Sequence, residues 1–219
     1  MDQHSLIHRR KFLQSSVITA VGAGAFGLLP QQSFGSPYAD DEINIIGPVK
    51  GYTPHIGIMV SMMAWIRESV IRATRNLTQE QLDFQLDDKS NSIGALLLHL
   101  AATDVVYQDM TFNGIKGFSE ENKKKWGVAM SLGEEAQKQI KGNNLDYYLT
   151  ALKDVREKTL AEFKRRDDKW FAEVDPAFFG GKPTNNYCKW FHVCEHEANH
   201  RGQITMIRKR LSGSKSGGD

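Results

Sequence analysis

The sequence predicts an all-α protein, a bundle of four long helices around one core. Four segments carry apolar residues at intervals of three and four, the spacing of helices that turn one face inward. No segment shows the strict alternation of a β-strand, and no internal repeat is visible. The roughly 180 residues that follow a leader sequence suit one domain with a sizeable core.

Residues 1–35 have the pattern of a twin-arginine (Tat) export signal. Arg9 and Arg10 precede a modestly apolar run over residues 17–29, which is too short and too rich in glycine for a membrane span of about 20 residues. We expect cleavage before Ser36, with Ala39 as an alternative site, and a mature protein that is periplasmic or otherwise exported. We expect no stable membrane insertion after cleavage.

The formal net charge of +2 comes from this leader, which holds three basic residues and one acidic residue. The rest of the chain is formally neutral, so it lacks the basic surface of a nucleic-acid-binding protein. We expect a small-molecule substrate as the partner and no nucleic acid. The sequence leaves the oligomeric state open, with a homodimer as one alternative.

The chain after the leader divides into an extended lead-in (36–53), a helical domain (54–211) and a flexible tail (212–219). Pro54 suits the first position of a helix, and the polar turn that ends at Ser92 supplies helix caps. Helical spacing places the four long helices over residues 54–75, 92–113, 145–165 and 190–211.

The fourth helical segment carries the chemistry. It contains three of the chain's seven histidines, His192, His196 and His200, at intervals of four. On a helix their Cβ atoms lie about 5–6 Å apart on one face, within reach of one ion. This face belongs to the apolar stripe, where a buried imidazole is costly unless it is hydrogen-bonded or bound to a metal. A lone histidine favours the first explanation, and a set at this spacing favours a metal.

The third ligand of such a site is less obvious. HEANH fits the pattern H-E-x-x-H and HVCEH fits its reverse, but both patterns need a further ligand downstream. After His200 the chain has no histidine or glutamate. The ligand therefore has to come from upstream, where His99 lies on the inward stripe of the second helix. A set of His192, His196 and His200 on one helix is the alternative.

These two segments resemble the DinB/YfiT-like family of four-helix metalloproteins over residues 54–211. The matching residues are Ser92, Ile93, Gly94, Leu97, His99, Leu100, His192, Val193, His196, His200, Arg201, Gly202 and Gln203. The resemblance implies a bundle with up-down-down-up connectivity. It also implies a divalent metal ion, often zinc or nickel, held by His99, His196 and His200.

Three imidazoles leave an open position on the ion, where the pKa of water falls to about 7. We therefore expect a metal-dependent hydrolase that acts on a small molecule, with Glu197 as the candidate base. A thiol S-transferase or isomerase, as among members of the family it resembles, is the alternative, although an oxidising periplasm offers little reduced thiol. A non-catalytic metal-binding bundle is the third hypothesis.

Other residues are expected around the metal. His192, Glu195, Gln203 and His55 are candidates to orient a ligand or to contact the substrate. The first three fall on or near the stripe of the fourth helix, and His55 lies one turn before Ile58 on the inward stripe of the first helix. The connection between the third and fourth helices, residues 167–184, is unusually aromatic. Since apolar rings on a long loop tend to cover a concave site, we expect its rings to line or cover the metal pocket. The rings are Trp170, Phe178 and Phe179.

Overall fold

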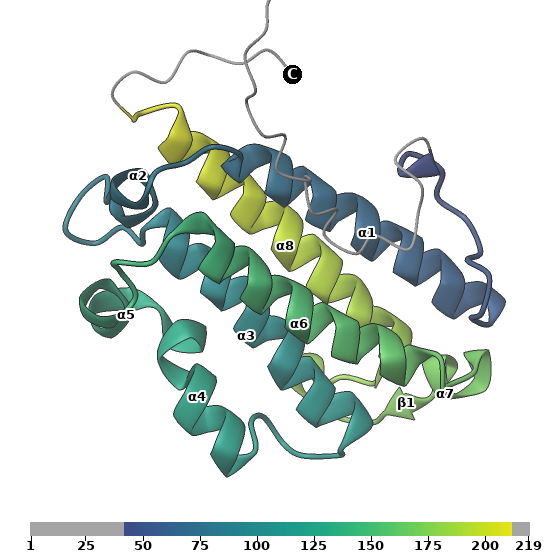
Figure 1. Ribbon diagram of the computed structural model, residues 1–219. Coiled ribbons are helices and arrows are strands. Elements are labelled where there is room, and N and C mark those ends of the chain that lie inside the picture. Colours follow the sequence, from purple (N-terminus) through teal and green to yellow (C-terminus); the bar gives the residue numbers. More distant parts are fainter. Residues whose placement is uncertain (1–41, 212–219) are drawn as a thin grey trace, which may run out of the picture. The chain divides into compact units, whose positions relative to one another are not determined.

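The structure is a computed structural model that describes residues 42–211 (Figure 1). The export signal, its cleavage site, the first part of the lead-in (36–41) and the tail lie outside the described residues, so the predictions for them stay predictions. Within residues 42–211 the structure is mainly helical, with two short strands, and the all-α prediction is confirmed. None of the described helices is long and apolar enough to cross a membrane.

Four long helices form the bundle: α1 (Pro54–Thr74), α3 (Ile93–Phe112), α6 (Leu145–Phe163) and α8 (Asn186–Arg208). Their bounds agree with the predicted ranges to within a few residues. Shorter elements connect them: α2 (Gln79–Asp83), α4 (Glu120–Ser131), α5 (Gly133–Gln139), α7 (Asp168–Ala172), β1 (Val174–Asp175), η2 (Phe179–Gly181) and β2 (Thr184–Asn185).

Polar side chains fix where the long helices begin. Ser92, Asn144 and Asn185 each accept a hydrogen bond from the backbone N–H three residues ahead, at 3.2, 3.0 and 2.8 Å. Each bond pairs an N–H group that has no partner inside the helix. The first turn of α1 instead relies on α7, where the Asp168 carboxylate accepts from the backbone N–H of His55 at 3.1 Å.

Contacts between the long helices define their directions. Arg208, near the end of α8, donates to the carbonyl oxygen of Ala73, near the end of α1, at 2.7 Å, so these two helices run parallel. Helix α3 runs antiparallel to α8, because His99 meets His196 while Tyr107, further along α3, meets the earlier residue His192.

Helices α3 and α6 are parallel to each other. Asp104 pairs with Arg156, and Gln108, one turn later on α3, donates to Thr159 of α6. The connectivity is therefore up-down-down-up, as the family resemblance implied. A parallel pair needs a connection that returns along the bundle, and α4, which packs along α3, and α5 provide it (Figure 1).

The core has an aliphatic part and an aromatic part. The aliphatic part centres on α3, where Gly94 lets Tyr148 approach closely, since a Cβ at this position would lie 2.6 Å from the tyrosine hydroxyl. The aromatic part closes the end of the bundle near α7, where Phe163, Phe171 and Trp190 are fully buried. Each such side chain contributes about 1.5–3 kcal/mol through burial.

Candidate metal centre

Three histidines from two helices meet between α3 and α8. The Nε2 atom of His196 lies 3.2 Å from the Nε2 atom of His99 and 3.2 Å from that of His200. One ligand nitrogen from each of the three residues lies within 4.8 Å of the others. The structure thus brings together the two-helix set expected from the sequence, which we call the histidine cluster. His192 lies next to it rather than in it.

The cluster fits a divalent ion. Two nitrogen ligands at about 2.0–2.1 Å from a tetrahedral ion are about 3.3 Å apart, close to the separations of 3.2 Å observed here. The outer nitrogens also have the partners that such ligands use: His99 Nδ1 donates to the Ala129 carbonyl at 3.0 Å, and His200 Nδ1 to the Gln203 side-chain oxygen at 2.8 Å. With Nδ1 protonated, both Nε2 atoms present lone pairs.

Both Nε2 atoms lie 3.2 Å from Nε2 of His196, and no Lys or Arg within residues 42–211 forms a hydrogen bond or ion pair with the three rings. Nitrogen lone pairs that face one another at 3.2 Å repel unless a proton or a cation lies between them. His196 has a further unfulfilled group, because its Nδ1 is buried and has no hydrogen-bond partner among the described residues. A shared cation would stabilise all three imidazoles at once.

The surroundings keep the three rings neutral. Burial, followed by the neighbouring imidazoles of His200 and His99, lowers the pKa of His196 to about 3. Burial likewise lowers the pKa of His99 and of His200. At neutral pH all three imidazoles are therefore unprotonated, the form that binds metals.

Helix α4 takes part in the site through its backbone. The carbonyl oxygen of Ala129 that holds His99 belongs to this helix. Asp109 on α3 fixes the start of α4, accepting from the backbone N–H of Ser119 at 2.8 Å and from the Asn122 side chain at 2.9 Å. The long connection after α3 therefore orients a ligand. The sequence did not reveal this role, because any residue type can supply a carbonyl.

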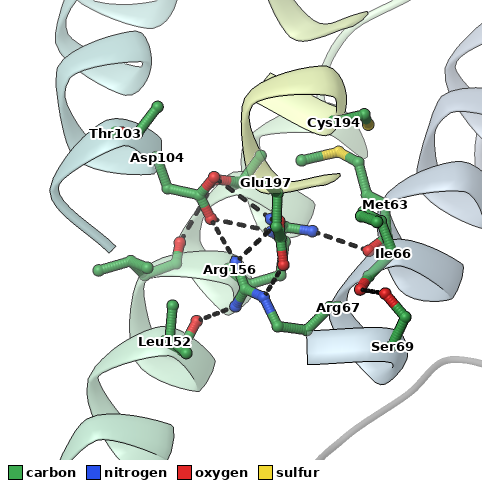
Figure 2. Close-up of polar contacts among 12 residues, drawn as sticks. Met63, Ile66, Arg67, Ser69, Thr103, Asp104, Leu152, Arg156, Cys194 and Glu197 are labelled. Carbon is green, nitrogen blue, oxygen red and sulfur yellow. Dashed lines mark hydrogen bonds and ion pairs between the residues drawn. The ribbon is translucent and has the colours of Figure 1, made fainter. Parts of the chain in front are cut away.

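Glu197, the expected base, belongs to a different cluster (Figure 2). Its carboxylate accepts hydrogen bonds from Arg67 of α1 and, at 2.9 Å, from Arg156 of α6. Arg156 also pairs with Asp104 of α3 at 2.9 Å, so each long helix contributes one buried charge. We call Arg67, Asp104, Arg156 and Glu197 the ion quartet.

A base at the metal would need a free carboxylate, whereas the Glu197 carboxylate is paired with two arginines. Burial alone would raise its pKa, but Arg67 and Arg156 outweigh burial and lower it. The carboxylate is thus held as a weakly basic anion among guanidinium groups. The expectation that Glu197 acts as base is corrected here. It looked plausible in the sequence because the two arginines lie 130 and 41 residues away along the chain.

The other expected residues fall into two groups. Gln203 orients His200, and His192 lies beside His196, with ring centroids 5.7 Å apart. His55 lies away from the cluster, with an exposed ring whose Nδ1 is 2.9 Å from Asp168. Glu195 is exposed, and no hydrogen bond or ion pair joins it to another described residue. The sequence therefore identified two neighbours of the cluster and two surface residues.

The aromatic residues of the connection over residues 167–184 also fall into two groups. The Phe179 ring lies 5.1 Å from that of His192, and Phe178 lies 6.3 Å from Tyr107, so both border residues next to the histidine cluster. Trp170 instead stacks on Phe112 at 5.6 Å and belongs to the aromatic end of the core. The prediction that this loop covers the metal pocket is therefore wrong for Trp170.

An all-α up-down-down-up bundle with three converging imidazoles defines a metal-binding protein of the DinB type. Comparison with protein families places it further: the chain belongs to the mycothiol-S-transferase family, whose sequence model matches residues 58–213. This family is part of the DinB superfamily, and the resemblance noted in the sequence is confirmed. A search of curated proteins finds no match.

Proposed function

We propose that this protein is a metal-dependent thiol S-transferase, which joins a low-molecular-weight thiol to an electrophilic carbon of a small molecule. The observation that carries the proposal is the set of three neutral, converging imidazoles in a member of the mycothiol-S-transferase family. The S-transferase thus replaces the hydrolase as the leading hypothesis. Mycothiol is the first thiol to test, because the family is named for it.

The residues of the site support thiol chemistry. When bound, a divalent ion supplies a positive centre that lowers the pKa of a thiol, so that the thiolate is available at neutral pH. His99, His196 and His200 are neutral ligands, and the metal-binding cluster found among the described residues includes no carboxylate. The full positive charge of the ion would therefore act on the sulfur. Ala129 and Gln203 fix the ring orientations of two ligands and reduce the reorganisation needed on binding.

The carboxylates argue against the hydrolase. Activation of water at neutral pH commonly uses a positioned base next to the metal. Glu197 is held by two arginines, and Glu195 is exposed on another face of α8. Neither is placed to take a proton from water in the histidine cluster. A thiol needs less help, because its ordinary pKa of about 8.5 is already close to neutral pH.

The test uses protein loaded with zinc or with nickel, and His196→Ala as the control. Each sample is mixed with mycothiol, cysteine or glutathione and with an electrophile, and the thioether product is measured by mass spectrometry. We expect product only with loaded wild-type protein and a thiol. Ester hydrolysis that needs no thiol would instead support the hydrolase. Inactivity in both assays with tight metal binding would support the non-catalytic bundle.

We keep export through the twin-arginine signal as a separate proposal, supported by Arg9, Arg10 and the apolar run that follows them. This route carries folded proteins, so the metal would be loaded before export. The variant with Arg9→Lys and Arg10→Lys should stay in the cytoplasm when fractions are probed with an antibody. Equal export of the variant and the wild type would reject the proposal.

A further inference from the structure

A hydrogen-bonded pair of side chains lies next to the histidine cluster and has no role so far. The hydroxyl of Tyr107 on α3 lies 2.8 Å from Nδ1 of His192 on α8. The two rings are stacked, with centroids 5.8 Å apart. The His192 ring is 5.7 Å from that of His196, a member of the cluster. We call Tyr107 and His192 the donor pair.

The hydrogen bond fixes the tautomer of His192. Tyr107 is buried, and its hydroxyl has no other hydrogen-bond partner among the described residues. We assign the phenol as the donor to His192 Nδ1, because a buried hydroxyl hydrogen without an acceptor is costly. Burial also raises the pKa of Tyr107, so the phenol keeps its proton. In the neutral ring the other proton then lies on Nε2.

The Nε2–H group of His192 is an unused donor. It has no partner within residues 42–211, and it is not among the atoms sealed from solvent. Phe178 and Phe179 border the pair with apolar surface. Lys189 contacts the loop that carries them. Its Nζ lies 3.1 Å from the Asp175 carboxylate and 4.2 Å from the centre of the Phe178 ring. The site thus combines one fixed donor with aromatic walls.

We propose that the donor pair is a binding subsite for the carbonyl oxygen of the electrophile, which we assign to the class of aryl-substituted α,β-unsaturated ketones. This inference rests on the proposed thiol transfer and names its substrate class. The oxygen of such a ketone accepts from His192 Nε2–H, and its apolar part packs on Phe178 and Phe179. His192 is then a catalytic residue, and Tyr107 a positioning residue that acts through it.

The reaction explains why a donor is useful at this place. The thiol sulfur forms a bond to the β carbon, and the π electrons of the C=C bond shift so that negative charge develops on the carbonyl oxygen. The charge returns to carbon when the proton released by the thiol is taken up at the α carbon, and the product is a saturated ketone. A donor already aimed at the oxygen stabilises the charge as it forms, and removing one such donor typically lowers kcat by about 100-fold to 1,000-fold.

The subsite is tested first by binding, which does not depend on turnover. The ligands are benzylacetone, a saturated ketone that cannot react, and butylbenzene, which has a similar shape but no oxygen. Affinities for zinc-loaded protein are measured by calorimetry. His192→Phe should weaken benzylacetone binding roughly fivefold, the effect of one neutral hydrogen bond, and leave butylbenzene unchanged. His192→Gln, whose amide N–H can replace Nε2–H, should restore part of the loss. His55→Phe, the same change at an exposed histidine, should have no effect.

Unchanged benzylacetone affinity in His192→Phe would overturn the subsite, and so would an equal loss for both ligands, which would indicate a purely apolar wall. The role of Tyr107 is tested by the ¹⁵N chemical shifts of His192, which distinguish the tautomers. Tyr107→Phe should shift His192 away from the Nε2–H form, and Tyr147→Phe on the surface of α6 should not. An unchanged tautomer in Tyr107→Phe would overturn the positioning role.

Kinetics with benzylideneacetone and a thiol complete the test. His192→Phe should lower kcat by roughly 100-fold while metal content stays at the wild-type level. If wild-type protein forms no thioether with any thiol but binds benzylacetone through His192, the transferase proposal fails and the subsite stands. If wild-type protein forms thioethers and His192→Phe forms them equally fast, the subsite fails and the transferase stands.

Discussion

The histidine cluster and the ion quartet are two buried polar groups in the same bundle. They differ in whether other protein groups pair with all of their polar atoms. The quartet balances two guanidinium groups against two carboxylates. Its arginines also donate hydrogen bonds to the carbonyl oxygens of Leu152 and Met63 (Figure 2). The histidine cluster has three neutral rings, facing lone pairs and a buried His196 Nδ1 that has no hydrogen-bond partner among the described residues. A buried polar cluster whose charges balance holds a fold together, and a cluster of converging neutral metal ligands indicates a binding site.

The largest effect expected from this difference is on metal affinity. His99→Ala, His196→Ala or His200→Ala should each reduce zinc affinity by more than about 100-fold, because two imidazoles cannot complete the coordination shell. The apo-proteins should unfold at urea concentrations close to that of the wild type. Affinity is measured by competition with a chelator, with His55→Ala as the matched control. Full stoichiometry in His99→Ala with loss in His192→Ala would mean that the ligands all come from α8.

Substitutions in the ion quartet should instead change the stability of the fold. Glu197→Leu leaves Asp104 as the one carboxylate of the quartet beside two buried guanidinium groups, so one positive charge is uncompensated, and we expect the free energy of unfolding to fall by about 3–5 kcal/mol. Replacing the whole quartet by apolar residues of similar size should recover most of this loss, since no unpaired charge then remains. Urea unfolding of the apo-proteins measures both. Glu197→Leu with wild-type stability would show that the carboxylate is not part of a buried ion network.

Loss of a hydrogen bond that orients a ligand should reduce zinc affinity less than loss of the ligand itself. Gln203→Leu removes the acceptor of His200 Nδ1 and should weaken zinc binding about 10-fold to 100-fold, with wild-type stoichiometry. Gln139→Leu, at an exposed position of α5, is the control and should bind as the wild type does. An affinity equal to the control would mean that the Gln203 hydrogen bond does not orient the ligand.

The last prediction concerns the pH dependence of stability. In the folded apo-protein the pKa of His196 is lowered to about 3, while in the unfolded chain it returns to about 6.5. Between these values the unfolded state binds the extra proton, so the apo-protein should lose stability as the pH falls from about 6.5 towards 3. The unfolding free energy of His196→Leu should depend less on pH in this range. An identical pH dependence in both proteins would contradict the neutral, buried state of His196.

The long helices and the histidine cluster could be predicted from the sequence because both rest on spacing along one chain segment. His99 was found because it lies on the inward stripe of its own helix. The quartet could not be predicted in this way, since Arg67, Asp104 and Arg156 acquire their roles only when four separate helices meet. The sequence shows Glu197 next to a ligand but not the arginines that hold it.

The roles of Ala129 and Tyr107 near the histidine cluster could not be predicted from the sequence, for different reasons. Ala129 acts through its carbonyl oxygen, which every residue has, and α4 brings it to His99 only in the folded chain. Tyr107 had no marker among the other aromatic residues, although its partner His192 was a candidate to orient a ligand, to contact the substrate or to bind the metal. In contrast, Trp170 was assigned to the pocket because it lies on an aromatic loop, although a partly buried tryptophan packs equally well at the end of a bundle.

X-ray absorption spectroscopy of the zinc-loaded protein tests the central claim most directly, because it reports the ligands of the metal with and without a thiol. We predict three imidazole nitrogens at about 2.0–2.1 Å, and one sulfur at about 2.3 Å after the thiol is added. His196→Ala is the control and should give no ordered site. A site with four protein ligands, or one in which sulfur does not appear at saturating thiol, would contradict the account of this cluster as the thiol-binding centre of a transferase.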